Sequence, residues 1–279
     1  MMSIVFLTIL IGLGSVAAGL LGALTGLGGG IVLVPMLTVF FHVDLRYAIG
    51  ASLVSVIATS SGAAAAYVRE GYTNVRVGMV LEVATTLGAV MGAYLAGFVP
   101  TPAIATIFGI VLLFSAYRAS KTHEERVTTD PPHPLATRLR LNSSYPTATG
   151  ERAYSVQNVP VGFGLMGVAG VLSGLLGIGS GALKVLAMDQ AMRLPFKVST
   201  TTSNFMIGVT AAASAGIYLH RGYIEPGLAL PVMIGVLAGA LLGARLLIFT
   251  RTAHLRILFT GVVVVLGLEM LYKGLTGGL

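Results

Sequence analysis

The chain has 279 residues, of which 55% are hydrophobic and only 10% are charged. A water-soluble protein of this length could not bury so much apolar surface in one core, so the composition indicates an integral membrane protein surrounded by lipid. The formal charge of +7 does not indicate a nucleic-acid partner, because Lys and Arg lie mainly in short connections and one linker, and the absence of cysteine excludes disulfides and Cys-based metal sites.

Unbroken apolar runs recur along almost the whole chain, and a helix needs roughly 20 apolar residues to cross the hydrocarbon of a bilayer. The pattern predicts an all-α polytopic membrane protein. The first run lacks a basic leading region and a polar cleavage region, so it is expected to stay in the mature protein. Eight spanning helices are expected, at about residues 3–24, 47–68, 77–98, 103–118, 160–178, 198–219, 227–249 and 255–272.

The chain also matches itself, because residues 19–95 align without a gap to residues 170–246 at a constant offset of 151. Of the 77 aligned pairs, 18 are identical. Landmarks in the first copy are Gly26 to Gly30, Ser52, Thr59, Tyr67, Gly71 and Tyr72, which align with Gly177 to Gly181, Ser203, Thr210, Tyr218, Gly222 and Tyr223. The sequence therefore predicts two homologous repeats, at residues 1–118 and 159–279.

The connection at residues 119–158 is polar and basic, and we expect it to be a mobile linker. Its dense cluster of Lys and Arg predicts a cytoplasmic location. The residues that give this character are Lys121, Glu124, Glu125, Arg126, Pro131, Pro132, Pro134, Arg138, Arg140 and Arg152.

The relative orientation of the repeats depends on the glycine-rich clusters. With four spans per repeat the copies would be parallel, and most basic residues of the second copy would lie outside the cell. If each cluster instead breaks its helix into a hairpin, with second arms at 31–41 and 182–192, the copies are inverted. The basic count of the second copy then becomes four inside and two outside. The inverted arrangement, a broken helix or hairpin followed by three spanning helices in each repeat, is preferred.

The two glycine clusters are the first candidate site. A break in a membrane helix is tolerated where backbone groups find protein or water, and a new helix that begins there presents free N–H groups to anions. The alternative is close helix packing through small residues, which is favoured for the pairs Gly88/Gly92 and Gly239/Gly243. Neither cluster fits a nucleotide-binding motif. The candidate anion-binding residues are Gly28, Gly29, Gly30, Gly179, Ser180 and Gly181.

Hydroxyl-rich stretches follow both clusters and could replace water around an oxyanion. The preferred substrate-binding pair is Ser52 and Ser203, together with Thr202 and Asn204. The alternative is that these side chains bond back to the carbonyls of their own helices.

Two ionisable residues within predicted membrane segments are functional candidates, because such residues are energetically unfavourable there. Lys184 follows the second cluster where the first repeat has Leu33, so it would place one positive charge beside the anion pocket. It could instead extend to the interface or pair with Asp189. Glu82 is a candidate for binding a coupling proton, unless it lies at the interface.

The duplicated glycine-rich segment, the stretch Ala48 to Leu53 and the segment Tyr67 to Tyr72 resemble the TauE/SafE sulfite exporter family, as does Ser199 to Asn204 in the second copy. The resemblance covers nearly everything except the linker. It implies a permease of the cytoplasmic membrane for small sulfur-containing anions, such as sulfite or organosulfonates, driven by an ion gradient. The site residues that the resemblance implies are limited to the glycine clusters and the Ser/Thr stretches. The role of Lys184 is inferred from its position alone.

The most economical function is a secondary transporter that exports or exchanges a small anion by alternating access, with a proton or sodium ion as coupling partner and no cofactor. An anion channel, or a permease for another small anion or organic acid, uses the same residue types and stays open. An enzyme is disfavoured, because the sequence has no HExxH, no GxSxG and no histidine in the middle of a span. Direction of transport and oligomeric state stay open.

Overall fold

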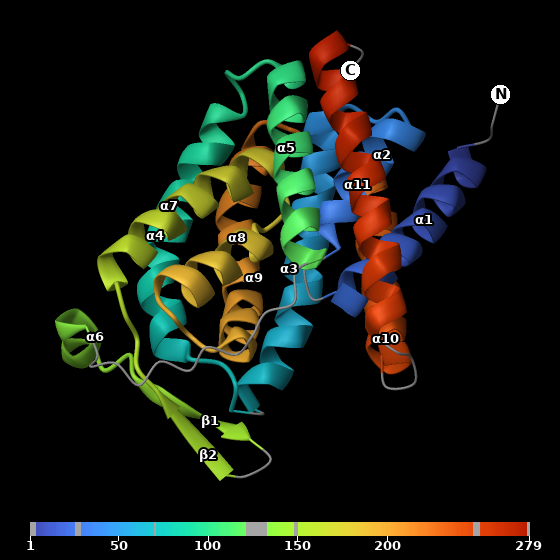
Figure 1. Ribbon diagram of the computed structural model, residues 1–279. Helices are drawn as coiled ribbons and strands as arrows, with labels where there is room; N and C mark the ends of the chain where they lie inside the picture. Colours follow the sequence, from blue (N-terminus) through green and yellow to red (C-terminus); the bar gives the residue numbers. More distant parts are fainter. Residues whose placement is uncertain are drawn as a thin grey trace.

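The computed structural model describes residues 4–25, 29–69, 71–120, 133–147, 150–247 and 252–277, and most of them are helical (Figure 1). The first half contains α1 (Ile4–Thr25), α2 (Gly30–Phe40), α3 (Leu45–Arg69), α4 (Val75–Leu95) and α5 (Thr101–Ser120). The connection contains α6 (Pro134–Arg138), β1 (Ser143–Thr147) and β2 (Gly150–Tyr154). The second half contains α7 (Val159–Leu176), α8 (Gly181–Leu186), a π-helical turn η1 (Ala187–Ala191), α9 (Phe196–His220), α10 (Pro226–Leu247) and α11 (Thr252–Thr276).

Long helices occupy all eight predicted apolar segments. Within the described residues, α4, α5, α7 and α10 are long and apolar enough to cross a membrane. The outer faces of these helices support that reading, because large apolar side chains recur there every three or four residues. On α4 they are Met79, Val83, Leu87, Met91 and Tyr94, each more than half exposed. A stripe of this kind is suited to lipid and not to water.

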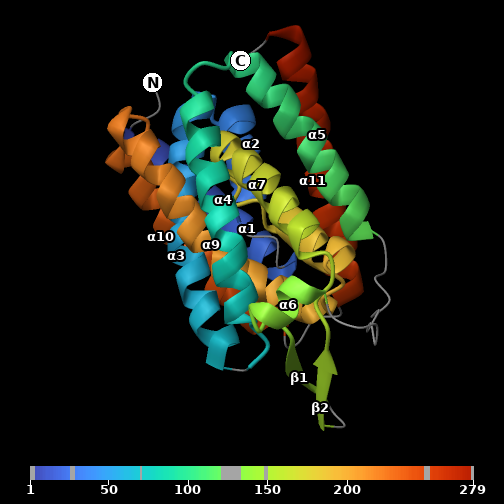
Figure 2. The same cartoon turned by 90° about the vertical axis from the view of Figure 1, so that its left-hand side faces the viewer.

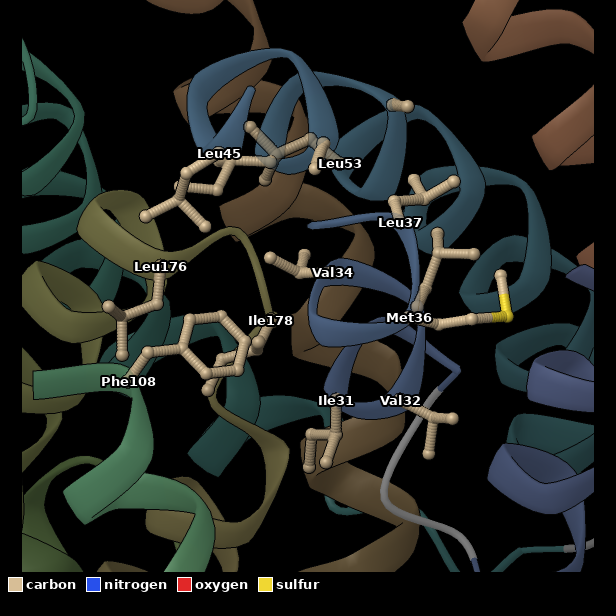
Figure 3. Packing of buried hydrophobic residues seen from close by; sticks show 14 of the residues in the cluster. Ile31, Val32, Val34, Met36, Leu37, Leu45, Leu53, Phe108, Leu176 and Ile178 are labelled. Carbon is tan, nitrogen blue, oxygen red and sulfur yellow. The ribbon is translucent and has the colours of Figure 1, made fainter. Parts of the chain in front are cut away.

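The two short helices lie where hairpin arms were expected. The helix α2 is almost completely buried, and Figure 3 shows its Ile31, Val34 and Leu37 among side chains of other elements. These neighbours include Phe108 of α5 and Ile178 in the segment between α7 and α8. A helix of 11 residues is too short to cross a bilayer, so α2 ends inside the bundle.

Helix boundaries recur at an offset of 151 residues. Adding 151 to the bounds of α2, 30–40, gives 181–191, the span of α8 with η1, and adding it to the bounds of α3, 45–69, gives 196–220, the span of α9. The packing of helices recurs in the same way. At this offset α1 corresponds to α7, α3 to α9 and α4 to α10. The pair α1 and α10 is therefore equivalent to the pair α7 and α4, and the pair α3 and α10 is equivalent to the pair α9 and α4. The remaining large contacts join α3 to α9 and α5 to α11, whose pairing is visible in Figure 2.

Both of these last pairs run antiparallel. At one end of α3 a β-carbon on Gly50 would lie 2.2 Å from the carbonyl oxygen of Tyr223, just beyond α9. At the other end, Thr201 near the start of α9 donates a hydrogen bond to the carbonyl of Tyr72 over 3.0 Å. In the second pair, Gly109 of α5 lies against Gly267 of α11, and the earlier residue Pro102 of α5 lies near the later residue Gly274 of α11. The order of contacts along the two helices is therefore reversed.

Close glycine contacts hold the helix pairs together. A β-carbon on Gly88 of α4 would lie 2.2 Å from the carbonyl oxygen of Gly167 in α7, and one on Gly239 of α10 would lie 2.0 Å from that of Val16 in α1. These contacts are equivalent after a shift of 151, since Gly88 and Gly239 correspond, as do Val16 and Gly167. The packing interpretation of Gly88, Gly92 and Gly239 is confirmed.

The molecule has two distinct ends. We call the "linker end" the one formed by residues 71–74, 133–158 and 192–195, where Asn74 bonds to Leu141 and Tyr154 and the backbone N–H of Gln157 donates to the carbonyl of Met192. The "opposite end" is formed by residues 41–44, 96–100 and 221–225, and there the Arg46 side chain donates to the carbonyl of Val99. In Figures 1 and 2 the hairpin and α6 lie at one extremity and the C-terminus at the other.

The expectation of a wholly α-helical protein is wrong within the linker, where residues 133–147 and 150–158 contain α6 and the two strands of a hairpin. The reason is a set of apolar side chains interspersed among the polar ones, which gives this segment a core of its own. Ala136, Leu141, Tyr145, Tyr154 and Val156 are buried and join Val77, Leu81, Met166, Met188 and Met192 in one cluster. The described part of the linker therefore packs onto α4, α7 and η1.

Candidate functional site

The described end of the first glycine cluster, Gly29 and Gly30, lies close to the second cluster, Gly177 to Gly181, and we call these the first and second glycine segments. The Ser52 hydroxyl, from α3, donates a hydrogen bond to the carbonyl of Gly177 over 2.8 Å. A β-carbon on Gly30 would lie 2.8 Å from the Ser52 hydroxyl oxygen and 3.4 Å from that carbonyl oxygen. Ser52 thus connects the start of α2 with the segment between α7 and α8. Gly28 lies outside the described residues.

The second glycine segment has an unusual backbone. Gly177, Gly179 and Ser180 all have positive φ angles, of 68°, 69° and 47°. Glycine adopts this conformation without steric penalty, whereas serine does so at a cost. The Ser180 side chain is 2% exposed, and its hydroxyl has no hydrogen-bond partner among the described residues. A buried hydroxyl without a partner is unfavourable, so this one is available to a ligand.

Gly29 and Gly181 lie at the first turns of α2 and α8. Gly29 precedes α2 and its carbonyl accepts bonds from the N–H groups of Val32 and Leu33. The carbonyl of Gly181, the first residue of α8, accepts a hydrogen bond from the Ser203 hydroxyl over 3.2 Å. Ser52 and Ser203 therefore both bond to glycine-segment carbonyls.

Lys184 is fully buried one turn after the second glycine segment. Its side chain is 0% exposed, and its Nζ donates to Thr210 Oγ1 of α9 over 2.5 Å. The Thr210 hydroxyl in turn donates to Glu82 Oε1 of α4 over 2.6 Å. Lys184 is thus neither at an interface nor hydrogen-bonded to Asp189, and a threonine connects it to the carboxylate that was predicted as a coupling residue.

Glu82 is held by its own helix as well. Thr85 and Thr86 donate to its two carboxylate oxygens over 3.2 Å and 3.1 Å. The side chain is half-buried, and its Oε1 lies against Thr210 of α9. A carboxylate with three hydroxyl donors is well solvated by the protein even without direct contact to a cation.

Two predicted site residues lie elsewhere. Thr202 accepts a hydrogen bond from the backbone N–H of Asn74 over 3.0 Å, so it fastens α9 to the turn before α4. Asn204 is half-buried on α9, and none of the side-chain hydrogen bonds among the described residues involves it. Most remaining hydroxyls bond to their own helices, as the alternative interpretation held: Ser55, Thr59, Ser61 and Thr200 all donate to carbonyls three or four residues earlier.

Three contributors were missed as site residues. Thr210 was counted as a repeat landmark and as part of the hydroxyl-rich stretch of the second copy, but not among the preferred site residues. Its bridging role depends on the approach of α4 to α9. Asn74 caps α4 through Val77 and donates to the linker, which no local pattern signals. Tyr154 accepts from Asn74, and burial raises the pKa of its phenol, so the group stays neutral at physiological pH.

The arrangement suits a small anion better than a metal or a nucleotide. It offers one buried ammonium, one unpartnered hydroxyl and a backbone segment in an irregular conformation. Within the described residues, no three His, Asp or Glu side chains gather as they would around a metal ion. Buried cationic and hydroxyl donors are the groups that replace water around an oxyanion.

Comparison with known proteins gives the chain its family context. It matches the family model described as "Sulfite exporter TauE/SafE" over residues 10–270. It is 28% identical over 281 residues to the "Probable membrane transporter protein YunE" of Bacillus subtilis (strain 168), covering 98% of this chain and 99% of that protein. It is 26% identical over 268 residues to the "Probable membrane transporter protein MJ0441" of Methanocaldococcus jannaschii, covering 91% of each.

A "Probable membrane transporter protein" of Xylella fastidiosa is 26% identical over 271 residues, covering 95% of this chain and 94% of that protein. No solved structure gives a significant match. The family model spans both halves and the linker, so the similarity concerns the whole architecture and not one segment. The chain belongs to the TauE/SafE sulfite exporter family.

Proposed function

We propose that this protein is a secondary transporter of small sulfur-containing anions, such as sulfite or organosulfonates, in the cytoplasmic membrane. The two halves act as inverted repeats that alternate access to a central site. The family description supports the substrate class, and the relatives' names support transport. The observation that carries the proposal is the fully buried Lys184 beside the second glycine segment.

The recurrence of contacts at an offset of 151 supports the repeat. Arg46 lies 5.7 Å from the ring centroid of Tyr223, and Lys197 lies 3.7 Å from that of Tyr72. Arg46 corresponds to Lys197, and Tyr72 to Tyr223, so these cation–π contacts are equivalent and each crosses between the halves. Equivalent contacts of this kind are expected when two similar halves are related by a two-fold axis.

The antiparallel pairs support inversion. The helices α3 and α9 are equivalent, and so are α5 and α11, yet each pair runs in opposite directions. A two-fold axis along the membrane normal would leave equivalent helices parallel, whereas an axis in the membrane plane reverses them. Inverted repeats give the outward-open and inward-open states related shapes, which is the geometric basis of alternating access.

The distribution of basic side chains supports a cytoplasmic linker end. Among the described residues, the opposite end carries Arg46, Arg221 and Lys273, and the linker end carries more. Those at the linker end are Arg76, Arg118, Arg138, Arg140, Arg152, Arg193 and Lys197. An excess of Lys and Arg in short membrane-flanking segments marks the cytoplasmic side.

The central site has the features that an oxyanion requires. Lys184 supplies charge, Ser180 supplies a free buried hydroxyl, and Ser52 and Ser203 could exchange their carbonyl partners for substrate oxygens. A buried charge inside a membrane protein marks a substrate or ion pathway. Gly29 and Gly30 complete the opposing wall, and with Gly179 and Gly181 they let the backbone approach closely.

Uptake of radiolabelled sulfite into liposomes that contain the purified protein tests this function. We expect saturable uptake, competition by sulfoacetate, and a reduction of at least about tenfold for Lys184→Ala, because one charge-assisted hydrogen bond contributes roughly 1.5–3 kcal/mol. Lys273→Ala, near the end of α11, is the matched control and should transport normally. Flux that does not saturate would indicate a channel, and no flux of any sulfur-containing anion would reject the assignment.

A further inference from the structure

Lys184 and Glu82 share one hydroxyl group and so form a single electrostatic unit. The Lys184 ammonium donates to Thr210, and Thr210 donates to the Glu82 carboxylate, over 2.5 Å and 2.6 Å. We call these three residues the relay. It joins α8, α9 and α4, and it includes a positive group that is 0% exposed. With Lys184 protonated and Glu82 ionised, one positive and one negative charge balance across the hydroxyl.

The fold does not require the relay. At an offset of 151 residues, Lys184 and Thr210 correspond to Leu33 and Thr59, and Glu82 corresponds to Met233. The equivalent set of positions therefore carries no charge. Thr59 donates only to carbonyls of its own helix, those of Ser55 and Val56. A charged pair that bridges the two halves at only one of two equivalent places, in otherwise similar surroundings, points to function and not to packing.

Anion binding changes this balance. The ammonium has three N–H donors, and one is used by Thr210, so two can reach a bound oxyanion. With an anion beside Lys184, two negative charges would share one positive charge in a poorly polarisable interior. Since Coulomb energies rise steeply there, the carboxylate is the group that can relieve the excess by taking a proton.

Among the side chains that the structure describes around the relay, no other charged group bonds to its members. The described charged or titratable side chains on the elements packed around the relay are Arg46 and Tyr47 on α3, Arg76 and Tyr94 on α4, Asp189 on η1, and Lys197, Tyr218 and His220 on α9. Among the described residues, none of these bonds to Lys184, Thr210 or Glu82. The α7 helix, which packs on both α4 and α8, carries no charged residue.

We propose that Glu82 takes up one proton for each monovalent anion that binds at Lys184, so that the protein is an electroneutral proton–anion symporter. This inference rests on the proposed function and names its coupling ion. The proton comes from water on the side from which the anion enters, and the Glu82 carboxylate becomes a neutral carboxylic acid. Thr210 then no longer needs to donate to Glu82, and its hydroxyl can turn toward the anion.

The test uses methanesulfonate, because this anion does not itself titrate near neutral pH. Proteoliposomes are prepared with the membrane potential clamped at zero, and two quantities are measured: exchange of labelled methanesulfonate at equal pH, and its accumulation under a gradient of one pH unit. We expect the wild type to exchange the anion and to accumulate it about tenfold on the alkaline side, the equilibrium ratio for one proton per anion.

The variants separate coupling from transport. Glu82→Gln should still exchange methanesulfonate but lose the accumulation, because glutamine cannot take up a proton. Thr210→Val should reduce accumulation and exchange, whereas Thr59→Val, the matched control in the other half, should behave as the wild type. Active exchange by Glu82→Gln also shows that this variant is folded.

The outcomes that overturn the inference are distinct from those that overturn the function. Wild-type exchange without accumulation, or accumulation by Glu82→Gln equal to the wild type, would reject proton coupling at Glu82 and leave the transporter in place. If Glu82→Gln is inactive, the wild-type accumulation ratio still tests proton coupling. The comparison of Thr210→Val with Thr59→Val then tests whether the relay is responsible for it. Absence of exchange by the wild type would reject the sulfonate site and the coupling together.

Discussion

At the scale of single residues, glycines determine how closely the helices approach. Gly92 of α4 would place a β-carbon 2.0 Å from the carbonyl oxygen of Val171, and Gly239 of α10 would place one 2.0 Å from that of Val16. Real side chains never come so near to backbone, so any substitution must push the helices apart. Gly164 on α7, by contrast, has no neighbouring atom within 4 Å of such a β-carbon.

We therefore predict that Gly92→Ala and Gly239→Ala lower thermal stability, each by roughly 1–3 kcal/mol, because overpacking shifts a helix pair. Gly164→Ala is the control and should be neutral or slightly stabilising. Thermal unfolding of the three variants in detergent, followed by size-exclusion chromatography, measures the effect. Equal melting temperatures for Gly92→Ala and Gly164→Ala would contradict the close approach of α4 to α7.

At the scale of elements, Asn74 fastens the linker to the bundle. Its side chain is 7% exposed; Nδ2 donates to the carbonyl of Leu141 and to the Tyr154 hydroxyl over 2.8 Å each, and Oδ1 accepts from the N–H of Val77. Its backbone N–H donates to Thr202. One residue thus connects the hairpin, the start of α4 and the start of α9.

Asn74→Ala should detach the linker, because it leaves a buried carbonyl and a helix N-terminus without partners, at roughly 1–3 kcal/mol for each group. We expect faster cleavage by protease within residues 133–158 and a lower melting temperature. Ser144→Ala, which removes only an exposed bond to Glu151, is the control. Identical cleavage rates for the two variants would show that Asn74 does not hold the linker.

At the scale of the whole molecule, the proposed inversion of the halves predicts on which side of the membrane given residues lie. His42 and Arg193 are equivalent at an offset of 151, both follow a short helix, and both are exposed with φ angles near +55°, at 53° and 55°. His42 lies at the opposite end and Arg193 at the linker end. Parallel repeats would place them on the same side of the membrane, and inverted repeats on different sides.

The chain contains no cysteine, so single cysteines can be introduced directly. In intact cells a membrane-impermeant maleimide should label His42→Cys, whereas Arg193→Cys and Ser143→Cys in the hairpin should react only after permeabilisation. Labelling of both His42→Cys and Arg193→Cys from the same side would rule out inverted repeats. Labelling of Ser143→Cys in intact cells would place the linker outside the cell.

Much of the fold could be predicted from the sequence because its signals are local or periodic. Apolar runs predicted all eight long helices, and the glycine clusters predicted the short helices α2 and α8 with η1. The site was predicted in part: Ser52 and Ser203 do contact the glycine segments, whereas Thr202 serves the turn at Asn74. A run of hydroxyls in a helix does not reveal which of its faces meets a substrate.

The sequence by itself therefore determined the membrane class, the number and order of long helices and the likeness of the two halves, because composition and repetition are properties of the chain alone. Only the tertiary structure decided that Lys184 and Glu82 meet through Thr210, that the linker folds, and that equivalent helices run antiparallel. Thr210 and Glu82 are 128 residues apart and belong to helices that are not consecutive. Contacts of this kind depend on how helices pack, and packing is set by many side chains together and not by any one segment.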